Sequence, residues 1–102
     1  LPMLSIGAKG VVSVVANIMP KEMKELIEAF LKQEYEKAYK LHTELYDVSR
    51  NMFIEGNPVT VKTAMKILGK IDNDIVRLPL VSCEEKTVDK LTKMFKQKGI
   101  IK

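Results

Sequence analysis

Apolar side chains recur at helical spacing through the middle of the chain. From Lys21 onward they fall at i, i+3, i+4, i+7 and i+8, which places them on one face of an α-helix. We expect a first helix that buries Met23, Leu26, Ile27, Phe30 and Leu31. A second helical stripe follows, made of Tyr35, Ala38, Leu41, His42, Leu45, Val48, Ser49, Met52 and Phe53. The stripe drifts near Gln33 and Glu34, so we predict a break there, although a single fused helix over 21–54 stays open.

A short β-branched run precedes these helices and has a different pattern. Gly10 to Asn17 reads Gly-Val-Val-Ser-Val-Val-Ala-Asn, after a helix-compatible segment, residues 1–6, that Gly7 closes. Such a run is typical of a strand buried on both faces of a parallel sheet. No other stretch resembles a partner strand, and a lone strand leaves its backbone N–H and C=O groups unpaired. We therefore expect the rest of the sheet to come from residues outside this sequence.

Two more helices are predicted in the second half of the chain. Asn57 is placed to cap a helix whose first residue is Pro58, with Val61, Ala64, Met65 and Leu68 buried and Gly69 at its end. Residues 71–81 form a connector with apolar anchors at Ile75, Leu78 and Leu80. Ser82 and Glu85 match a capping box for a last helix, which buries Val88, Leu91, Met94 and Phe95 and ends at Gly99.

Composition narrows the class of protein. The 102 residues are 46% hydrophobic, enough for a modest core, and carry a net charge of +4. The lysines are mixed with glutamates throughout the helical segments and form no basic stripe, which argues against a nucleic-acid interface. A single cysteine, Cys83, cannot form an internal disulfide and fits a reducing, cytoplasmic compartment. No apolar segment approaches the ~20 residues needed to cross a bilayer.

Few residues carry candidate chemistry, and each has a plainer explanation. His42, the only histidine, lies on the apolar stripe without metal-ligand neighbours, so a packing role is favoured over a catalytic base. Cys83 precedes a helix N-terminus but has no partner base nearby in sequence. Ser13 lacks the glycine elbow of a hydrolase nucleophile, and Glu84 and Glu85 fit the helix dipole. Five methionines at packing spacing (Met19, Met23, Met52, Met65 and Met94) are interpreted as core residues.

Three stretches resemble the dihydrodipicolinate synthase family. Residues 7–17, Gly-Ala-Lys-Gly-Val-Val-Ser-Val-Val-Ala-Asn, resemble the segment that leads into and forms its last barrel strand. Residues 53–62, Phe-Ile-Glu-Gly-Asn-Pro-Val-Thr-Val-Lys, resemble the signature F-x-E-x-N-P-I-P-V-K, and residues 77–80 match R-L-P-L. The order and spacing agree along the whole chain. Thr60 stands where a second proline is usual, Gln33-Glu34 replaces a glycine-containing break, and Val12 replaces an isoleucine.

The resemblance implies a parent (β/α)₈ TIM barrel with a C-terminal helical domain, of which this chain is the last third. Within it, residues 1–33 would complete the barrel and residues 34–102 would form the helical domain. The chain itself would be mostly α, a helical bundle plus one barrel strand. A complete barrel needs about 250 residues, so the other seven strands would lie upstream.

The same resemblance implies a class I pyruvate lyase of lysine and diaminopimelate biosynthesis. Pyruvate forms a Schiff base with a lysine in this family and condenses with aspartate semialdehyde, without a cofactor or metal. That lysine and the other catalytic residues would lie upstream, and only Val12 maps to the substrate pocket. The parent is expected to be a cytoplasmic homo-oligomer.

Two alternatives stay open. The parent could be another pyruvate aldolase of the same fold. The chain by itself could act only as a structural or oligomerisation module that supports a barrel, without catalysis. The upstream sequence would separate these, because catalysis requires a lysine at the end of strand six and a tyrosine on strand five.

Overall fold

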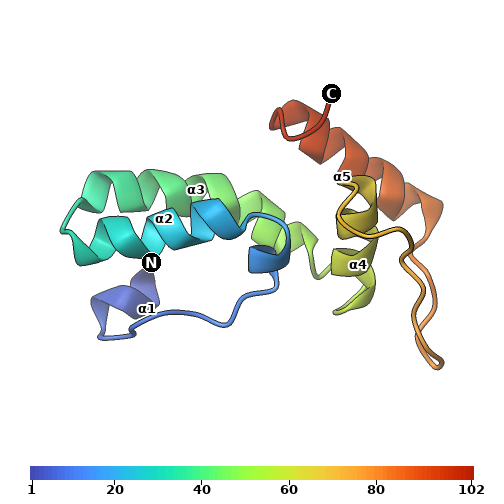
Figure 1. The fold of residues 1–102 in the computed structure, drawn as a ribbon, viewed down its shortest axis with the longest axis horizontal. Coiled ribbons are helices and arrows are strands. Elements are labelled where there is room, and N and C mark those ends of the chain that lie inside the picture. The colour runs from blue at the N-terminus through green and yellow to red at the C-terminus, as the bar shows by residue number, and fades with distance from the viewer. The chain divides into compact units, whose positions relative to one another are not determined.

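A computed structural model describes all residues, 1–102, and contains only helices and loops (Figure 1). The helices are α1 (Pro2–Ser5), the 3₁₀ helix η1 (Val15–Asn17), α2 (Pro20–Leu31), α3 (Tyr35–Asn51), α4 (Val59–Ile67) and α5 (Glu85–Gln97). The chain divides into two compact units, Leu1–Ser49 and Arg50–Lys102, which are called the first and second unit below. The division predicted at residues 33 and 34 concerns a complete barrel and stays a prediction.

The first unit is built around the antiparallel helices α2 and α3. Figure 1 shows the two running along each other in opposite directions, with the short α1 nearby. Pro20 begins α2, as predicted, where its missing N–H costs no hydrogen bond. The buried apolar residues of this unit are Leu4, Val15, Ile18, Leu26, Ala29, Ala38, Leu41, Leu45 and Val48. The predicted stripes are confirmed at Leu26, Ala38, Leu41, Leu45 and Val48, while Met23, Ile27 and Phe30 are only half-buried. The predicted burial is wrong at the ends of the stripes: Leu31, Tyr35 and Phe53 are exposed, because they lie at or beyond the helix ends.

The strand predicted over 10–17 is not formed, and this prediction is wrong for the chain as it stands. Residues 8–13 are irregular, and Val15–Asn17 forms a 3₁₀ turn closed by the Ile18 N–H donating to the Val15 carbonyl at 2.9 Å. The physical reason is that no second strand is present to accept or donate the hydrogen bonds of a β-ladder. Val15 is buried, whereas Val11 and Val12 lie on the surface.

The helix break predicted at Gln33 and Glu34 is confirmed. The Gln33 N–H donates to the Phe30 carbonyl and the Glu34 N–H to the Ala29 carbonyl, at 2.9 and 2.8 Å, which is the Schellman pattern. Phe30 and Tyr35 pack edge to face across the turn, with ring centroids 5.4 Å apart. The motif requires a left-handed residue, and Gln33 adopts a φ of +64°. No Gly or Pro is needed because hydrogen bonds and ring packing hold Gln33 in the conformation that glycine usually takes.

We therefore expect Gln33→Gly to stabilise the chain by roughly 0.5–1 kcal/mol, since a side chain in the left-handed region costs more than the added freedom of glycine. Chemical denaturation of the two proteins measures the difference. Lys32→Gly is the matched control, because Lys32 has a φ of −83° and gains nothing from glycine. A Gln33→Gly variant as unstable as the Lys32→Gly control would contradict the assignment of strain to Gln33.

The second unit has α4 packed with α5. Its buried apolar residues are Met52, Val59, Val61, Ala64, Leu91, Met94 and Phe95. The predicted burial is confirmed for Val61, Ala64, Leu91, Met94 and Phe95, while Met65, Leu68 and Val88 are half-buried. Gly69 and Gly99 end α4 and α5 as predicted. The predicted connector anchors are wrong: Ile75, Leu78 and Leu80 are 69%, 87% and 40% exposed.

The predicted cap of α4 is also wrong. The helix begins at Val59, Pro58 is its N-cap residue, and no side chain caps it. The Thr60 N–H, which Asn57 would have bonded, donates instead to the Gly56 carbonyl at 3.2 Å. The Thr60 hydroxyl accepts the Glu55 N–H at 3.2 Å. Local hydrogen bonds around Thr60 therefore replace the Asn57 cap.

The capping box predicted at Ser82 and Glu85 is not formed either. Helix α5 begins at Glu85, with Glu84 as its N-cap residue. The Glu84 N–H donates to both carboxylate oxygens of Glu55, at 3.1 and 3.2 Å. A partner 29 residues away in sequence thus fixes the start of α5, and no local pattern could have indicated it.

Candidate functional site

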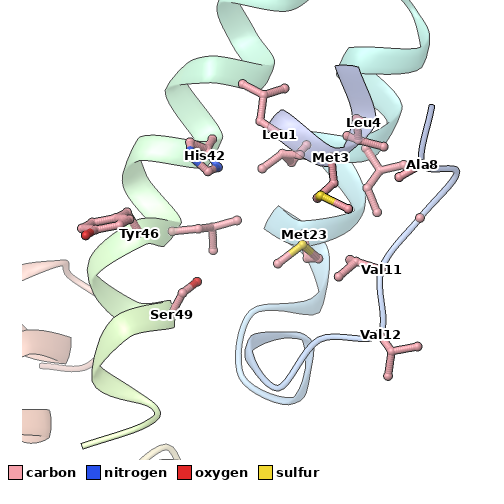
Figure 2. Close-up of a pocket in the computed structure, with 14 residues that line it drawn as sticks. Leu1, Met3, Leu4, Ala8, Val11, Val12, Met23, His42, Tyr46 and Ser49 are labelled. Carbon is pink, nitrogen blue, oxygen red and sulfur yellow. The ribbon is translucent and has the colours of Figure 1, made fainter. Parts of the chain in front are cut away.

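The first unit contains an apolar cavity of about 460 Å³. Its walls come from α1, the segment that follows it, α2 and α3. The lining residues are Leu1, Met3, Leu4, Ala8, Gly10, Val11, Val12, Met23, Leu26, Ile27, His42, Leu45, Tyr46 and Ser49 (Figure 2). Only three of these side chains are polar, so the cavity is an apolar hollow with few groups that could orient a ligand.

Val12, the one residue mapped to a substrate pocket by resemblance, lies at the edge of this cavity. Figure 2 shows Val11 pointing toward Met23 and Val12 pointing away from the helices. The Val12 side chain is fully exposed, at 105% of its reference area. No backbone hydrogen bond within the chain engages residues 9–12. Both the side chain and the backbone at this position are open to a neighbour.

His42 lies where the sequence placed it, half-buried on the inner stripe of α3. Burial lowers the pKa of its imidazole, and the nearby N-terminal ammonium of Leu1 lowers it further. No hydrogen bond joins its ring to another side chain. The neutral imidazole therefore serves as part of an apolar wall, which agrees with the packing role favoured by the sequence.

The other candidate groups are not brought together with a catalytic partner. Ser13 is half-buried, and its carbonyl, not its hydroxyl, accepts a hydrogen bond, from the Ala16 N–H. Cys83 is a half-buried free thiol in the second unit. The Glu84 carboxylate pairs with Lys86 at 2.5 Å and raises the pKa of that exposed ammonium. None of these contacts joins a nucleophile to a base.

A polar cluster in the second unit fixes the connector onto α4. The Asp74 carboxylate accepts from the Thr63 hydroxyl and from the Lys66 ammonium, each at 2.9 Å. The Lys66 hydrogen bond, the largest cause, lowers the pKa of Asp74 despite partial burial. One residue further on, the Ile75 carbonyl accepts from the Lys62 ammonium. Three side chains of one helix thereby hold two consecutive connector residues.

A second hollow, of about 550 Å³, lies between the start of α4 and this connector. Its lining residues are Pro58, Lys62, Asn73, Ile75, Val76, Arg77 and Leu80. The Arg77 carbonyl accepts from the Leu80 N–H at 3.0 Å, but its guanidinium forms no ion pair or hydrogen bond, so it presents five free donors. The hollow combines an unpaired cation with apolar walls.

Sequence reasoning missed both the Asp74 cluster and the Glu55 contact. The i, i+3 spacing of Thr63 and Lys66 could have indicated that they share a helix face. Nothing in the sequence indicated which connector carboxylate would meet them.

The structure has no group of three or more His, Cys, Asp or Glu side chains that could hold a metal ion. No helix is long and apolar enough to cross a membrane.

The sequence and the backbone of this chain are both similar to those of known proteins. The model of the dihydrodipicolinate synthetase family matches residues 1–98. The 4-hydroxy-tetrahydrodipicolinate synthases of Geotalea daltonii and Hydrogenobaculum sp. are 48% and 45% identical, over 98% and 99% of this chain and 34% of each relative. The crystal structure of dihydrodipicolinate synthase from Aquifex aeolicus matches with a TM-score of 0.91 at 42% identity, and that from Thermotoga maritima with 0.93 at 38%. Each structural match covers 98% of this chain and 34% of the other.

Proposed function

The chain belongs to the dihydrodipicolinate synthetase family, and we propose that it forms the final third of a lyase that condenses pyruvate with aspartate semialdehyde. The chain spans about a third of the length of the curated relatives it matches. The observation that carries the proposal is that almost the whole chain matches synthases of this one family, both in sequence and in backbone structure. The parent would act in lysine and diaminopimelate biosynthesis as a cytoplasmic enzyme.

The proposed chemistry begins outside these 102 residues. A lysine amine attacks the keto carbon of pyruvate, and water leaves as the imine forms. The corresponding enamine then adds to the aldehyde carbon of the semialdehyde. In this chain every lysine except the half-buried Lys62 is exposed, and the Lys62 ammonium donates to the Ile75 carbonyl. A Schiff-base lysine needs a desolvated or cationic pocket to lose its proton at neutral pH, so we propose that none of these lysines is the nucleophile.

Val12 is proposed to line the pyruvate pocket of the complete enzyme, largely through its backbone. Two observations support this role. Its side chain is uncovered by the chain's own helices, and the backbone of residues 9–12 has no internal partner. Neighbouring barrel strands would supply the missing ladder hydrogen bonds and would convert this irregular segment into the last strand.

We expect the complete protein, but not this chain alone, to form a trapped adduct with pyruvate. Borohydride reduces the imine, so one pyruvate becomes covalently attached to one lysine, and intact mass with peptide mapping locates it. The adduct should lie outside the 102 residues described here. Omission of pyruvate is the control. A complete protein without an adduct would contradict the lyase proposal, and a stoichiometric adduct on this chain would contradict the assignment of its lysines.

A second role is supported for the chain by itself, that of a non-catalytic assembly module. Large apolar side chains remain exposed in both units, including Val12 and Leu78. Such surfaces mark interaction sites when they are contiguous. The parent is proposed to be a homo-oligomer, although one solved relative, 38% identical, is described as a monomeric dihydrodipicolinate synthase variant.

A further inference from the structure

The hollow between the start of α4 and the connector is lined by positive charge and by no negative charge. Its lining residues include Lys62 and Arg77 but no Asp or Glu. Asp74, which follows a lining residue in sequence, is already paired with the Lys66 ammonium at 2.9 Å. Asp72 is exposed and lies outside the lining. The charge of the hollow therefore favours an anion.

The polar side chains of this hollow also offer hydrogen-bond donors. The Arg77 guanidinium is exposed and unpaired, with five N–H groups. The Lys62 ammonium donates to the Ile75 carbonyl and has two further N–H groups. Asn73 accepts the Ile75 N–H at 3.3 Å through its side-chain oxygen, which leaves its amide NH₂ as a donor. Three side chains can thus donate to the oxygens of a bound anion.

The backbone that carries these donors is held by hydrogen bonds within the second unit. The Lys62 ammonium fixes the connector at Ile75, next to the Asp74 cluster described above. The Leu80 N–H donates to the Arg77 carbonyl at 3.0 Å and closes a tight turn. A ligand would therefore have little backbone to order on binding, which lowers the entropic cost of association.

Apolar side chains form the rest of the lining. They are Pro58, Ile75, Val76 and Leu80. An inorganic anion gains nothing from such walls, whereas a carboxylate with a short aliphatic chain would bury apolar surface against them. The volume of about 550 Å³ lies in the range of small-molecule sites, roughly 300–1,000 Å³.

We propose that this hollow binds a small aliphatic carboxylate. The planar Arg77 guanidinium donates two parallel N–H···O bonds to the carboxylate oxygens, a geometry that arginine forms and lysine does not. Lys62 adds a second positive charge, and the apolar walls take the aliphatic chain. The proposal goes beyond the lyase reaction, because it concerns binding by side chains of this chain and involves no Schiff base.

A titration of the isotope-labelled 102-residue chain with butyrate, followed by NMR, tests the site. Butyrate has a carboxylate and a short chain but no keto or aldehyde group that could form an imine with a lysine. We expect saturable shifts of amide signals at the start of α4 and in residues 73–80. Arg77→Ala should raise the dissociation constant at least about tenfold, because charge-assisted hydrogen bonds are lost.

Two control variants separate the fork of donors from charge alone. Arg77→Lys keeps the charge but not the paired donors, and should raise the dissociation constant about threefold. Arg50→Ala removes the only other arginine, also exposed, and should change it less than about twofold, because salt screens distant charges. Equal effects of Arg77→Ala and Arg50→Ala would mean that only net charge matters, and the absence of saturable shifts would mean that there is no site. Either result overturns the proposal.

A comparison of anions tests the assignment to an aliphatic carboxylate. Butyrate should bind roughly fourfold more tightly than acetate, because two further CH₂ groups are partly buried against the apolar walls. Inorganic phosphate should bind more weakly than butyrate. Equal affinities for acetate and butyrate, or tighter binding of phosphate, would contradict an aliphatic carboxylate as the ligand.

The complete parent protein shows whether the hollow stays open there. Ligand-observed NMR with butyrate, on the parent and on its Arg77→Ala variant, should give the same loss of affinity as in the 102-residue chain. Binding to the 102-residue chain alone would mean that other parts of the parent cover the hollow, and the proposal would fail. A parent that binds butyrate through Arg77 but forms no pyruvate adduct would confirm this site and contradict the lyase proposal.

Discussion

Replacing Phe95 with alanine is expected to unfold the second unit. The Phe95 ring is completely buried, and truncating a buried phenylalanine costs about 3–5 kcal/mol, because the lost transfer free energy adds to that of a cavity. Folded domains are stable by roughly 0.05–0.15 kcal/mol per residue. The free energy of unfolding of a unit of this size is therefore similar to the cost of the substitution. Hydrogen exchange should show loss of amide protection across α4 and α5.

Phe53→Ala is the matched control for this prediction. Phe53 is 55% exposed, so the same change of residue type should alter the free energy of unfolding by about 0.5 kcal/mol or less. Retained protection in α4 and α5 of the Phe95→Ala variant would show that this unit does not depend on its largest core side chain.

The sequence predicted the helices well because each bears its own signal. The buried residues of α2, α3 and α5 recur at 3.6-residue spacing, which is a local property of the chain. Helix ends were predictable where the signal was equally local, as at Pro20 and Gly99. Gln33 shows that this local reasoning extends beyond glycine, because the drift of the apolar stripe marked the break without a glycine.

The failures share a physical cause: a local pattern does not show whether a partner remote in sequence is present. The segment Val11-Val12-Ser13-Val14-Val15 has the propensity of a strand, but a strand exists only as part of a ladder, and no second strand is present. The start of α5 depends on Glu55, 29 residues earlier. The anchors predicted at Ile75, Leu78 and Leu80 are apolar, yet here they are exposed. Apolarity in the sequence therefore did not predict burial at these three positions.

The candidate site was the least predictable part. Val12 was assigned to a substrate pocket only through resemblance, since nothing in its residue type distinguishes it from Val11 or Val14, and this assignment stays a prediction. The position of His42 was predictable from its place on the helical stripe. The Asp74 cluster was not, because its members were recognisable as polar side chains but their contact depended on the path of the connector.

The isolated chain is expected to self-associate through its first unit. Met3, Ile6, Val11 and Val12 are 65%, 77%, 58% and 105% exposed, and burying apolar surface contributes about 25 cal/mol per Å². The unpaired backbone of residues 9–12 can pair with another copy in the same way as an exposed strand edge. Light scattering over a wide concentration range should give an apparent mass at least twice that of one chain.

A single added charge distinguishes this surface from non-specific association. Val12→Lys places a desolvation penalty on the edge that would pair, and lysine is the residue with which natural proteins protect such edges. We expect it to raise the concentration for half-association about tenfold, which corresponds to ~1.4 kcal/mol. Tyr39→Lys adds the same charge on α3, where Tyr39 is 65% exposed and outside the cavity lining, and should change that concentration less than twofold. Equal effects of the two variants would mean that net charge, and not the open segment at 9–12, governs association. A wild-type chain that stays monomeric at every concentration would mean that its own helices protect this segment in solution.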